Sequence, residues 1–538
     1  MAAQPARNPW LILMVLCLAV FMLLLDTTIV NVAQRKIQIG LGADLAEIQW
    51  VLDSYILAYA VLLLSFGRIG DVFGRRRLFI IGMVIFSVAS GLCGVSGWLG
   101  DFVGVSGVNA LIAARVLQGI GGAFMMPQTL SLIAVAFPPE RRGAAMGIWG
   151  GIVALGAVIG PVAGGLIVTN YAWEWIFLIN IPVGIAAIAL TLLIVPESVD
   201  PHASRRIDWG GLFLSGFGIF AVVFALIEAN RMGWSDPFIL GLFAAGAALL
   251  VAFVWWEKRV DDPMMKIELF KLRNFWVGNV ITGVMAFGMF GIFFPLTLFL
   301  QGTLGFTPIR AGLSLIPMSL TIMITAPLAG RLTDRVGARW ILVTGLSLVT
   351  TGILLIIMQS SLDTTWQSLF PALLVTGAGM GLTFAPMTAA AMREVPPRIS
   401  GSASGIINTT RNIGQVLGIA VLGSILQSRV VSYVRADLEV TPLDAATRAE
   451  VVELARNSRF DELATIIPAG QADLLPSIYL SIQESSVSAL HDTFLVSAAA
   501  CLLGVGVAFM IRNHARAPVA PQTAPATTTP QERAATAD

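Results

Sequence analysis

Charged residues are scarce in this chain. Only 12% of its 538 residues are Asp, Glu, Lys or Arg, against roughly 25% in an average soluble protein. Hydrophobic residues make up 56% of the sequence, and the mean hydropathy is +0.82. A water-soluble protein of this composition would expose extended apolar patches, which promote aggregation. The scarcity of charge therefore excludes a soluble globular protein and predicts an integral membrane protein.

Several kinds of functional site are also missing from the sequence. The net charge of +1 lacks the basic excess of a nucleic-acid-binding protein. There is no Walker A motif, no soluble segment long enough for an ATPase domain, and no spacing typical of a nucleophile and its base. The three cysteines lie in separate apolar runs without metal-ligand or disulfide spacing: Cys17, Cys93 and Cys501. We therefore expect no enzymatic activity, no metal, no cofactor and no nucleic-acid partner.

Long apolar runs dominate what is present. A helix needs about 20 mostly apolar residues to cross the hydrocarbon core of a bilayer. Fourteen segments meet this requirement: 10–32, 47–66, 78–97, 106–131, 144–167, 175–195, 208–228, 237–256, 274–300, 309–329, 340–358, 367–391, 401–426 and 491–511. The sequence therefore predicts an all-α membrane protein with fourteen transmembrane helices.

The distribution of Lys and Arg predicts the orientation of these helices. If the N-terminus lies in the cytoplasm, the cytoplasmic segments contain 22 Lys and Arg residues and the short outer loops contain only 4. Positively charged short loops stay on the cytoplasmic side of a membrane, whereas long loops translocate largely regardless of charge. Both terminal segments, 1–9 and 513–538, are therefore expected in the cytoplasm.

Two segments lie outside the predicted spans. In the long outer loop 427–490, residues 444–466 have helical spacing, with Val451, Leu454 and Ala455 on one side. This pattern predicts an amphipathic helix over the outer mouth, and a docking surface for an envelope adaptor protein is the alternative. The C-terminal segment 513–538 is rich in Ala, Pro and Thr and is expected to be disordered.

One loop motif occurs twice. Residues 67–77 read GRIGDVFGRRR and residues 330–339 read GRLTDRVGAR, so both follow G-R-x-x-D-x-x-G-x-R after a helix that runs toward the cytoplasm. Glycine permits a tight turn, and an aspartate can bind a cation or cap a helix N-terminus. The duplication predicts two related halves and a conformational gating role for the residues Gly67, Asp71, Gly74, Arg75, Gly330, Asp334 and Arg339.

Together with four further stretches, this loop resembles the major facilitator superfamily, in particular its fourteen-span drug–proton antiporter branch. The stretches are LDTTIVNVA at 25–33, RVLQGIG at 115–121, the glycine-rich segment 156–165 and WEWIFLINIP at 173–182. The resemblance covers about 10–512. It implies two six-helix bundles, 10–195 and 274–512, around a central cavity, with 208–256 as an inserted helix pair.

The resemblance also implies a function. It predicts export of amphipathic drugs or related small molecules in exchange for protons, by alternating access, with a proton gradient as the energy source. We expect a monomer in a bacterial cytoplasmic membrane, since 29 Arg against 4 Lys favours a GC-rich bacterial genome. Two alternatives stay open: a transporter of lipid-like molecules, and an importer or uniporter for a defined solute.

Charged side chains inside the predicted spans are the candidate functional residues. An ionised group in the hydrocarbon core costs several kcal/mol, so it pairs, faces water or, if acidic, becomes protonated. Asp26 is therefore the candidate proton carrier, and the resemblance implies that Arg115 takes part in coupling. Asp53 either binds cationic substrates or is solvated at the outer interface, and Arg411 either binds anions or holds helices together. Further substrate-binding candidates are Asn31, Gln118 and Asn408.

A stripe of small residues marks the fifth predicted span. Gly156, Gly160 and Gly164 recur every four residues and so share one helix face. Small residues let helix backbones approach closely, and Pro161 favours a bend. The resemblance implies that this segment favours antiport by resisting leak, and tight packing without a gating role is the alternative.

Overall fold

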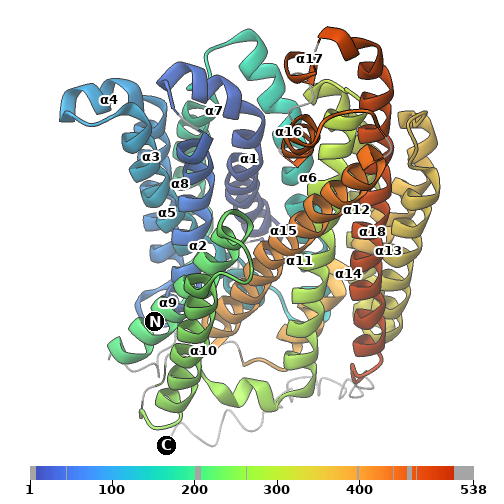
Figure 1. The fold of residues 1–538 in the computed structure, drawn as a ribbon. Coiled ribbons are helices and arrows are strands. Elements are labelled where there is room, and N and C mark those ends of the chain that lie inside the picture. The colour runs from blue at the N-terminus through green and yellow to red at the C-terminus, as the bar shows by residue number, and fades with distance from the viewer. Residues whose placement is uncertain are drawn as a thin grey trace, which may run out of the picture.

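The computed structural model describes residues 8–43, 45–199, 208–261, 263, 265–396, 399–439, 441–456, 463–467 and 469–513. Helices and their connections make up these residues, and no β-strand occurs among them. Most of the predicted cytoplasmic segments 1–9 and 513–538 lies outside the described residues. Figure 1 shows the helices standing side by side. The end of the molecule where the first helix begins and the last one finishes is called the termini end below.

The first half of the chain forms one group of helices. The helices are α1 (Pro9–Leu41), α2 (Leu45–Phe73), α3 (Arg75–Gly94), α4 (Ser96–Val103), α5 (Gly107–Ala136), α6 (Pro139–Asn170), α7 (Trp175–Leu178) and α8 (Asn180–Ile194). Within this group α5 packs against α2 and α3, and α1 packs against α6 and α8. The short helices α4 and α7 lie at the end opposite the termini, which is called the far end (Figure 1).

The second half forms a matching group. Its helices are α11 (Arg273–Leu298), continued by a π-helical turn (Phe299–Thr303), α12 (Pro308–Val336), α13 (Arg339–Gln359), α14 (Trp366–Arg393), α15 (Ser400–Glu439), α16 (Ala445–Arg456), α17 (Leu463–Ile466) and α18 (Leu475–Ala508). Short 3-10 helices precede α11 and α18, at Ile267–Lys271 and Ala469–Leu474. The halves meet along two seams, where α2 packs against α15 and α6 packs against α12.

An inserted pair of helices covers one of these seams. It consists of α9 (Trp209–Met232) and α10 (Pro237–Glu257). α9 contacts both α2 and α15, whereas α10 packs mainly on α9. Leu57 and Ala60 of α2, Ile219 and Val223 of α9 and Val416 of α15 share one buried apolar cluster. The pair therefore belongs to the outer surface of the bundle and not to the central region between the halves.

The repeated loop explains two glycines. Gly74 and Gly337 occupy the same position in the two copies of the motif, and both have a positive φ, of 113° and 90° respectively. L-residues with a side chain rarely adopt this conformation, but glycine adopts it without steric cost. Each glycine separates two helices, α2 from α3 and α12 from α13. The duplicated sequence thus produces a duplicated turn at the termini end.

The membrane-spanning character of the helices agrees with the sequence. Within the described residues, 13 helices are long and apolar enough to cross a membrane. α6, which packs between α1 and α12, corresponds to the remaining predicted span. The all-α membrane fold with fourteen transmembrane helices is therefore confirmed.

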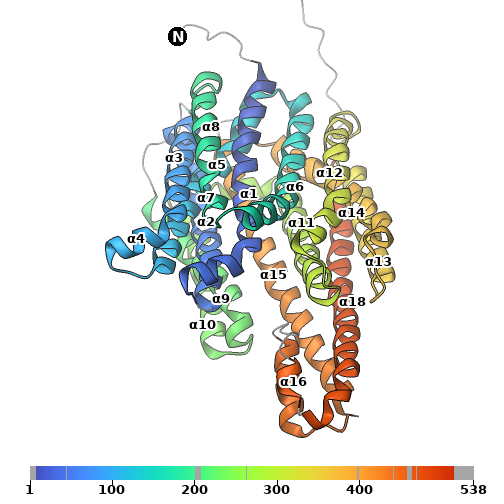
Figure 2. The same cartoon turned by 90° about the horizontal axis from the view of Figure 1, so that it is seen from above.

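The largest departure from the predicted boundaries lies in the outer loop 427–490. α15 continues through Glu439 and α18 already begins at Leu475, so both helices extend far into the predicted loop. Figure 2 shows α15, α16 and α18 projecting beyond the other helices at the far end. The sequence had predicted that this helix lies over the outer mouth. Instead, α16 packs on α15 within this projection. Its predicted apolar face is confirmed, since Val451, Leu454 and Ala455 are buried.

Candidate functional site

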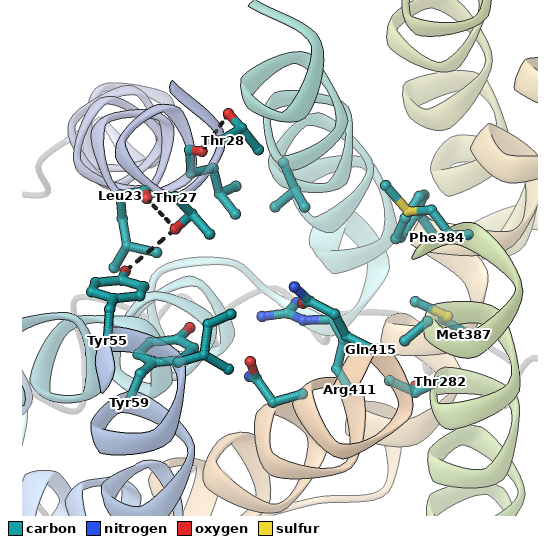
Figure 3. A pocket seen from close by; sticks show the side chains of 16 residues that line it. Leu23, Thr27, Thr28, Tyr55, Tyr59, Thr282, Phe384, Met387, Arg411 and Gln415 are labelled. Atoms are coloured by element: carbon teal, nitrogen blue, oxygen red, sulfur yellow. Dashed lines mark hydrogen bonds between the residues drawn. The ribbon is translucent and has the colours of Figure 1, made fainter. Parts of the chain in front are cut away.

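A central cavity lies between the two halves (Figure 3). The space within it that is not filled by atoms is about 780 Å³, including space that is open to solvent. Helices of both halves contribute to its wall. The lining residues are Leu23, Leu24, Thr27, Thr28, Tyr55, Ile56, Tyr59, Val153, Thr282, Ala286, Met289, Phe384, Met387, Arg411, Asn412 and Gln415. The wall is therefore mostly apolar, with a few polar groups concentrated on α1, α2 and α15.

A buried ion pair lies next to this cavity. Asp26 of α1 is 0% exposed and Arg115 of α5 is 1% exposed, and the guanidinium donates to Oδ2 of the carboxylate at 2.6 Å. Arg115 also donates to the backbone carbonyl of Val51 on α2 at 3.1 Å. In a low-dielectric interior, each charge would be costly without the other. The structure thus brings together the two residues that the sequence singled out for proton coupling.

Neutral polar groups complete the surroundings of Asp26. The amides of Gln118 and Asn180 each donate to its Oδ1 at 2.8 Å. Both amides also reach the hydroxyl of Ser90, at 2.6 and 3.3 Å. The carboxylate is thus held directly from α5 and α8, and Ser90 of α3 holds the two amides. The cluster of Asp26, Ser90, Arg115, Gln118 and Asn180 is called the acid cluster below.

Sequence reasoning missed two members of the acid cluster. Ser90 and Asn180 are neutral, and a neutral polar residue in an apolar run is too common to mark a site. One signal for Asn180 was present, because it belongs to the WEWIFLINIP stretch at 173–182 that carries part of the family resemblance. Gln118 was taken as a substrate-binding candidate, but it lies in the acid cluster and does not line the cavity.

Tyr55 joins the acid cluster to the cavity. Its ring lines the cavity wall, and the guanidinium carbon of Arg115 lies 4.3 Å from the ring centroid. A cation held over an aromatic face is attracted by the ring. The hydroxyl of Thr27, the residue after Asp26, approaches the Tyr55 hydroxyl at 3.4 Å. If Arg115 moved away from Asp26, the packing of Tyr55, which lines the cavity, would therefore change.

Arg411 extends from α15 into the opposite side of the cavity. Figure 3 shows its side chain beside that of Gln415, directed into the open space. Its guanidinium donates to the side-chain oxygen of Asn408 and lies 5.3 Å from the ring centroid of Trp149. Asn408 itself is fully buried and also bonds the backbone of Ser404. Asn408 thus orients Arg411, whereas Arg411 is the group that faces the cavity.

Two other substrate-binding candidates lie away from the cavity wall. Asp53 is half-buried on α2 and is not part of the cavity lining. Asn31 is exposed on α1, where its side-chain oxygen accepts from the amide of Gln34 at 3.5 Å. Neither side chain is placed to contact a ligand in this cavity.

The first copy of the loop motif connects the two halves. Asp71 on α2 is 0% exposed and accepts hydrogen bonds from the backbone N–H groups of Gly401 and Ser402, at 2.8 and 2.9 Å. These groups form the N-terminus of α15, whose dipole favours a negative charge. Arg75 holds the same carboxylate through a contact of 2.6 Å. Asp71 therefore fastens the first half to the second at the termini end.

The segment that follows α8 reinforces this contact. The Arg75 guanidinium donates to the hydroxyl of Ser198 at 2.8 Å, and the Arg75 backbone N–H donates to the Ser198 carbonyl at 3.0 Å. Ile399 and Ala403 of the second half share a buried apolar cluster with α1, α2 and α5 of the first half. The halves are thus closed against each other at the termini end in this structure.

In the second copy of the motif, Arg339 occupies the position of Arg76 in the first copy, and the two residues make matching contacts. Arg76 donates to the backbone carbonyl of Leu192, and its backbone N–H donates to the side chain of Glu197. Arg339 donates to the backbone carbonyl of Ile511 and its backbone N–H donates to the side chain of Asn513, so it binds within its own half. The side chain of Asp334 is outside what the structure describes. The glycines do correspond, because Gly67 and Gly330 each sit where a Cβ would collide with a backbone carbonyl of the other half, of Gly401 and Gly143 respectively. The duplicated sequence therefore supports both seams through close backbone approach, but only the first copy contributes an observed ion pair.

The glycine stripe of α6 faces α1. A Cβ on Gly156 would meet Leu24, a Cβ on Gly160 would collide with Thr28, and a Cβ on Gly164 would meet Ile29. The Thr28 hydroxyl donates to the Gly156 carbonyl at 3.2 Å. The side chain of Pro161 is outside the described residues. The stripe therefore holds α6 against the helix that carries Asp26, and its gating role stays a prediction.

The described residues contain no group of three or more His, Cys, Asp or Glu side chains that could hold a metal ion. The cysteines Cys17, Cys93 and Cys501 are all buried and unpaired. Charges, hydrogen bonds and apolar contacts are the interactions that the described residues of the site can offer a ligand.

Comparisons with known proteins identify the family. The family model described as the Major Facilitator Superfamily matches residues 16–419. The tetracenomycin C resistance and export protein of Streptomyces glaucescens is 33% identical over 515 residues, which cover 94% of this chain and 92% of that protein. The multidrug resistance protein Stp of Mycobacterium tuberculosis is 34% identical over 453 residues, or 84% of this chain and 82% of that protein.

Solved structures support the fold. The proton:xylose symporter XylE, bound to 6-bromo-6-deoxy-D-glucose, superposes with a TM-score of 0.56 at 13% identity, covering 91% of this chain and 94% of that one. At this identity the likeness concerns the fold alone. The family match spans most of the chain, and the relatives above are transporters and not enzymes. The chain therefore belongs to the major facilitator superfamily, and it is a multi-pass membrane transporter.

Proposed function

We propose that this protein exports amphipathic small molecules in exchange for protons, by alternating access, from the cytoplasmic membrane of a bacterium. The observation that carries the proposal is the acid cluster, which places a buried carboxylate one residue away from the cavity wall formed by Thr27 and Thr28. A titratable acid beside a central cavity is what proton-coupled transport requires. The names of two relatives, one a resistance and export protein and the other a multidrug resistance protein, agree with it.

The acid cluster supports coupling because its ion pair depends on one proton. When Asp26 is ionised, Arg115 is held on it and the pair is neutral. When Asp26 is protonated, the attraction is lost, and the guanidinium is left buried without its counter-charge. Arg115 then gains from moving toward other partners, and the Tyr55 ring, whose centroid is 4.3 Å from the guanidinium carbon, is part of the cavity wall. Protonation and cavity occupancy are thereby linked through one side chain.

Alternating access needs a contact that can be released. The Asp71 carboxylate, bonded to Gly401 and Ser402 of the other half, is proposed as that contact. It holds the termini end closed while the cavity is open to the far end. Opening the termini end would break both backbone hydrogen bonds at once, while the Asp71–Arg75 pair stays within the first half.

The cavity is formed within one chain, so a monomer is proposed as the working unit. The apolar lining, with Phe384, Met289 and Met387, suits adaptable binding of apolar bodies. Few polar groups converge on the cavity, which favours an amphipathic cargo over a highly polar solute.

The test uses purified protein in liposomes that contain the pH indicator pyranine. Tetracenomycin C, the compound in the name of one relative, and the dye ethidium are added from outside, without an imposed voltage. A proton-coupled exchanger should move protons only when a transported compound is present. Transport of a compound with no proton movement would reject antiport and favour a uniporter, while movement of fluorescent phospholipid alone would favour a lipid transporter.

A further inference from the structure

The central cavity contains one formal charge, and it is positive. Among the sixteen described residues that line it, Arg411 is the only one that is ionised. Asp26 is not part of the lining, and Arg115 cancels its charge at 2.6 Å. Asp53 is also absent from the lining. A ligand in the cavity therefore meets an unbalanced positive charge.

Arg411 has hydrogen-bonding capacity that the protein does not use. A guanidinium has five N–H donors. Asn408 accepts one of them, and the hydroxyl of Tyr59 is a second neutral partner. No carboxylate of the described residues forms a salt bridge with it. The remaining donors of Arg411 point into the cavity, next to the amide of Gln415 (Figure 3).

A second donor without an acceptor lies close by. Trp149 of α6 is 2% exposed, and its indole N–H has no hydrogen-bond partner among the described residues. Its ring lies 5.3 Å from the guanidinium carbon of Arg411. Buried donors are normally satisfied, and each one that is not costs free energy. Arg411, which has donors left over, and Trp149, whose indole N–H has no acceptor among the described residues, are thus neighbours.

We propose that Arg411 makes the cavity selective for amphipathic anions, meaning molecules with an apolar or aromatic body and one carboxylate, sulfonate, phenolate or phosphate group. The anionic group would lie against Arg411 and Gln415, with its body along Phe384, Met289 and Met387. The arriving anion offsets the cost of the buried cation, whereas a cationic compound would be repelled by it. This inference deepens the proposed export function and replaces the expectation that Asp53 selects cations.

The test compares two probes that share one aromatic body. 8-Anilinonaphthalene-1-sulfonate carries a negative charge, and N-phenyl-1-naphthylamine is the same molecule without the sulfonate. Binding of each is measured on protein held in phosphatidylcholine nanodiscs, with the binding to empty nanodiscs subtracted. In Arg411→Gln, the affinity for the sulfonate should fall by about 10-fold to 100-fold, the range expected for a hydrogen bond to a charged group. The affinity for the neutral probe should change by less than about 3-fold.

Two further variants serve as controls for this test. Arg411→Lys retains the charge and should keep a clear preference for the sulfonate. Arg310→Gln removes an exposed arginine that stacks on Phe306 and does not line the cavity, so it should leave both affinities unchanged. An equal loss for both probes in Arg411→Gln, or a loss of preference in Arg310→Gln, would overturn the proposal. No proton gradient is present, so the outcome does not depend on whether the protein exports.

The anion could come from a soluble compound or from a lipid headgroup, and the nanodisc composition separates these sources. The titration is repeated with one third of the lipid replaced by phosphatidylglycerol. The negative surface potential of this lipid lowers the apparent affinity for the anionic probe in both proteins. If soluble anions are the cargo, the fall is equal in the unmodified protein and in Arg411→Gln, and if an anionic lipid occupies the site, the fall is larger in the unmodified protein. Both results support the anion site, and a larger fall in Arg411→Gln contradicts it.

Discussion

Asp26 is fixed in place by hydrogen-bond donors from α5 and α8, and it has no contact with water. Its two carboxylate oxygens accept from Arg115, Gln118 and Asn180. The donors come from residues that are themselves at most 1% exposed. A proton can reach this carboxylate only if the surrounding helices move. Protonation of Asp26 is therefore coupled to a conformational change.

We predict that Asp26→Asn abolishes proton-coupled transport while the protein still folds. Asparagine matches the protonated acid in size but cannot release a proton, and it leaves Arg115 without a counter-charge. Removing one partner of a buried ion pair costs about 3–5 kcal/mol, so the thermal unfolding temperature should fall as well. The measurement is substrate-driven proton movement in liposomes.

Asp26→Glu, which keeps a titratable group, should retain part of the coupling. Asp101→Asn, at an exposed position on α4, serves as the control and should behave like the unmodified protein. If Asp26→Asn still moves protons in step with substrate, the coupling group lies elsewhere.

The sequence allowed this site to be found in part, for a physical reason. Asp26, Arg115 and Arg411 stood out because a charge inside an apolar run needs an explanation wherever the helix lies. Ser90 and Asn180 did not stand out, because a neutral polar side chain can bond its own helix. Nor could the sequence decide which charges share a space. Only the packing of helices shows that Asp26 is paired while Arg411 faces the cavity.

At the scale of helices, the contact between α2 and the N-terminus of α15 should control opening at the termini end. We predict that Asp71→Asn weakens this contact and shifts the protein away from the state closed there by about 10-fold, since the charge-assisted hydrogen bonds to Gly401 and Ser402 become neutral ones. Transport turnover should slow. The shift can be measured by the distance between spin labels on α3 and α15 at that end.

Asp236→Asn is the matched control for this variant. Asp236 caps α10 by accepting from the N–H of Phe238 at 2.8 Å, so the same substitution changes a helix cap within the inserted pair and not between the halves. It should leave turnover and the label distances unchanged. An unaltered distance in Asp71→Asn would show that other contacts hold the halves together.

The packing of α6 on α1 gives a second prediction for helices. Gly160→Ala places a methyl group against the side chain of Thr28, and overpacking of this kind costs about 1–3 kcal/mol. The unfolding temperature should therefore fall. Gly241→Ala, on α10, is the control, because a Cβ there meets nothing within 4 Å and alanine favours a helix. Equal stability of the two variants would mean that α1 and α6 can separate without cost.

The length of α15 was underestimated for a reason that concerns all membrane helices. Leu426, Val430, Val434 and Leu438 are buried and spaced four residues apart, which continues one apolar face of the helix. The polar residues Arg429 and Asp437 interrupt this apolar pattern, and both bond side chains of α18. A helix in lipid is apolar all round, so its end was placed where that character stops. The projecting part packs this face on α16 and α18, and the four-residue spacing was present in the sequence.

At the scale of the whole molecule, the excess of Lys and Arg at the termini end predicts its orientation. A membrane-impermeant maleimide should label Glu450→Cys, on the projection at the far end, in intact cells. It should label Lys271→Cys, between α10 and α11, only after the membrane is permeabilised. The native cysteines are buried, which keeps the background low. Labelling of Lys271→Cys in intact cells would reverse the orientation, and with it the direction assigned to transport.

The positive charge of Arg411 in the cavity has a consequence for membrane voltage. If the cargo is a monovalent anion, its exit and the entry of one proton both move charge in the direction that a negative interior favours. Each elementary charge gains about 2.3 kcal/mol per 100 mV, so the two together could support a concentration ratio on the order of 1,000 from voltage alone. A monovalent cation leaving against one proton would gain nothing from voltage and would depend on the pH difference. The charge of Arg411 would thus determine whether the membrane voltage or only the pH difference drives export.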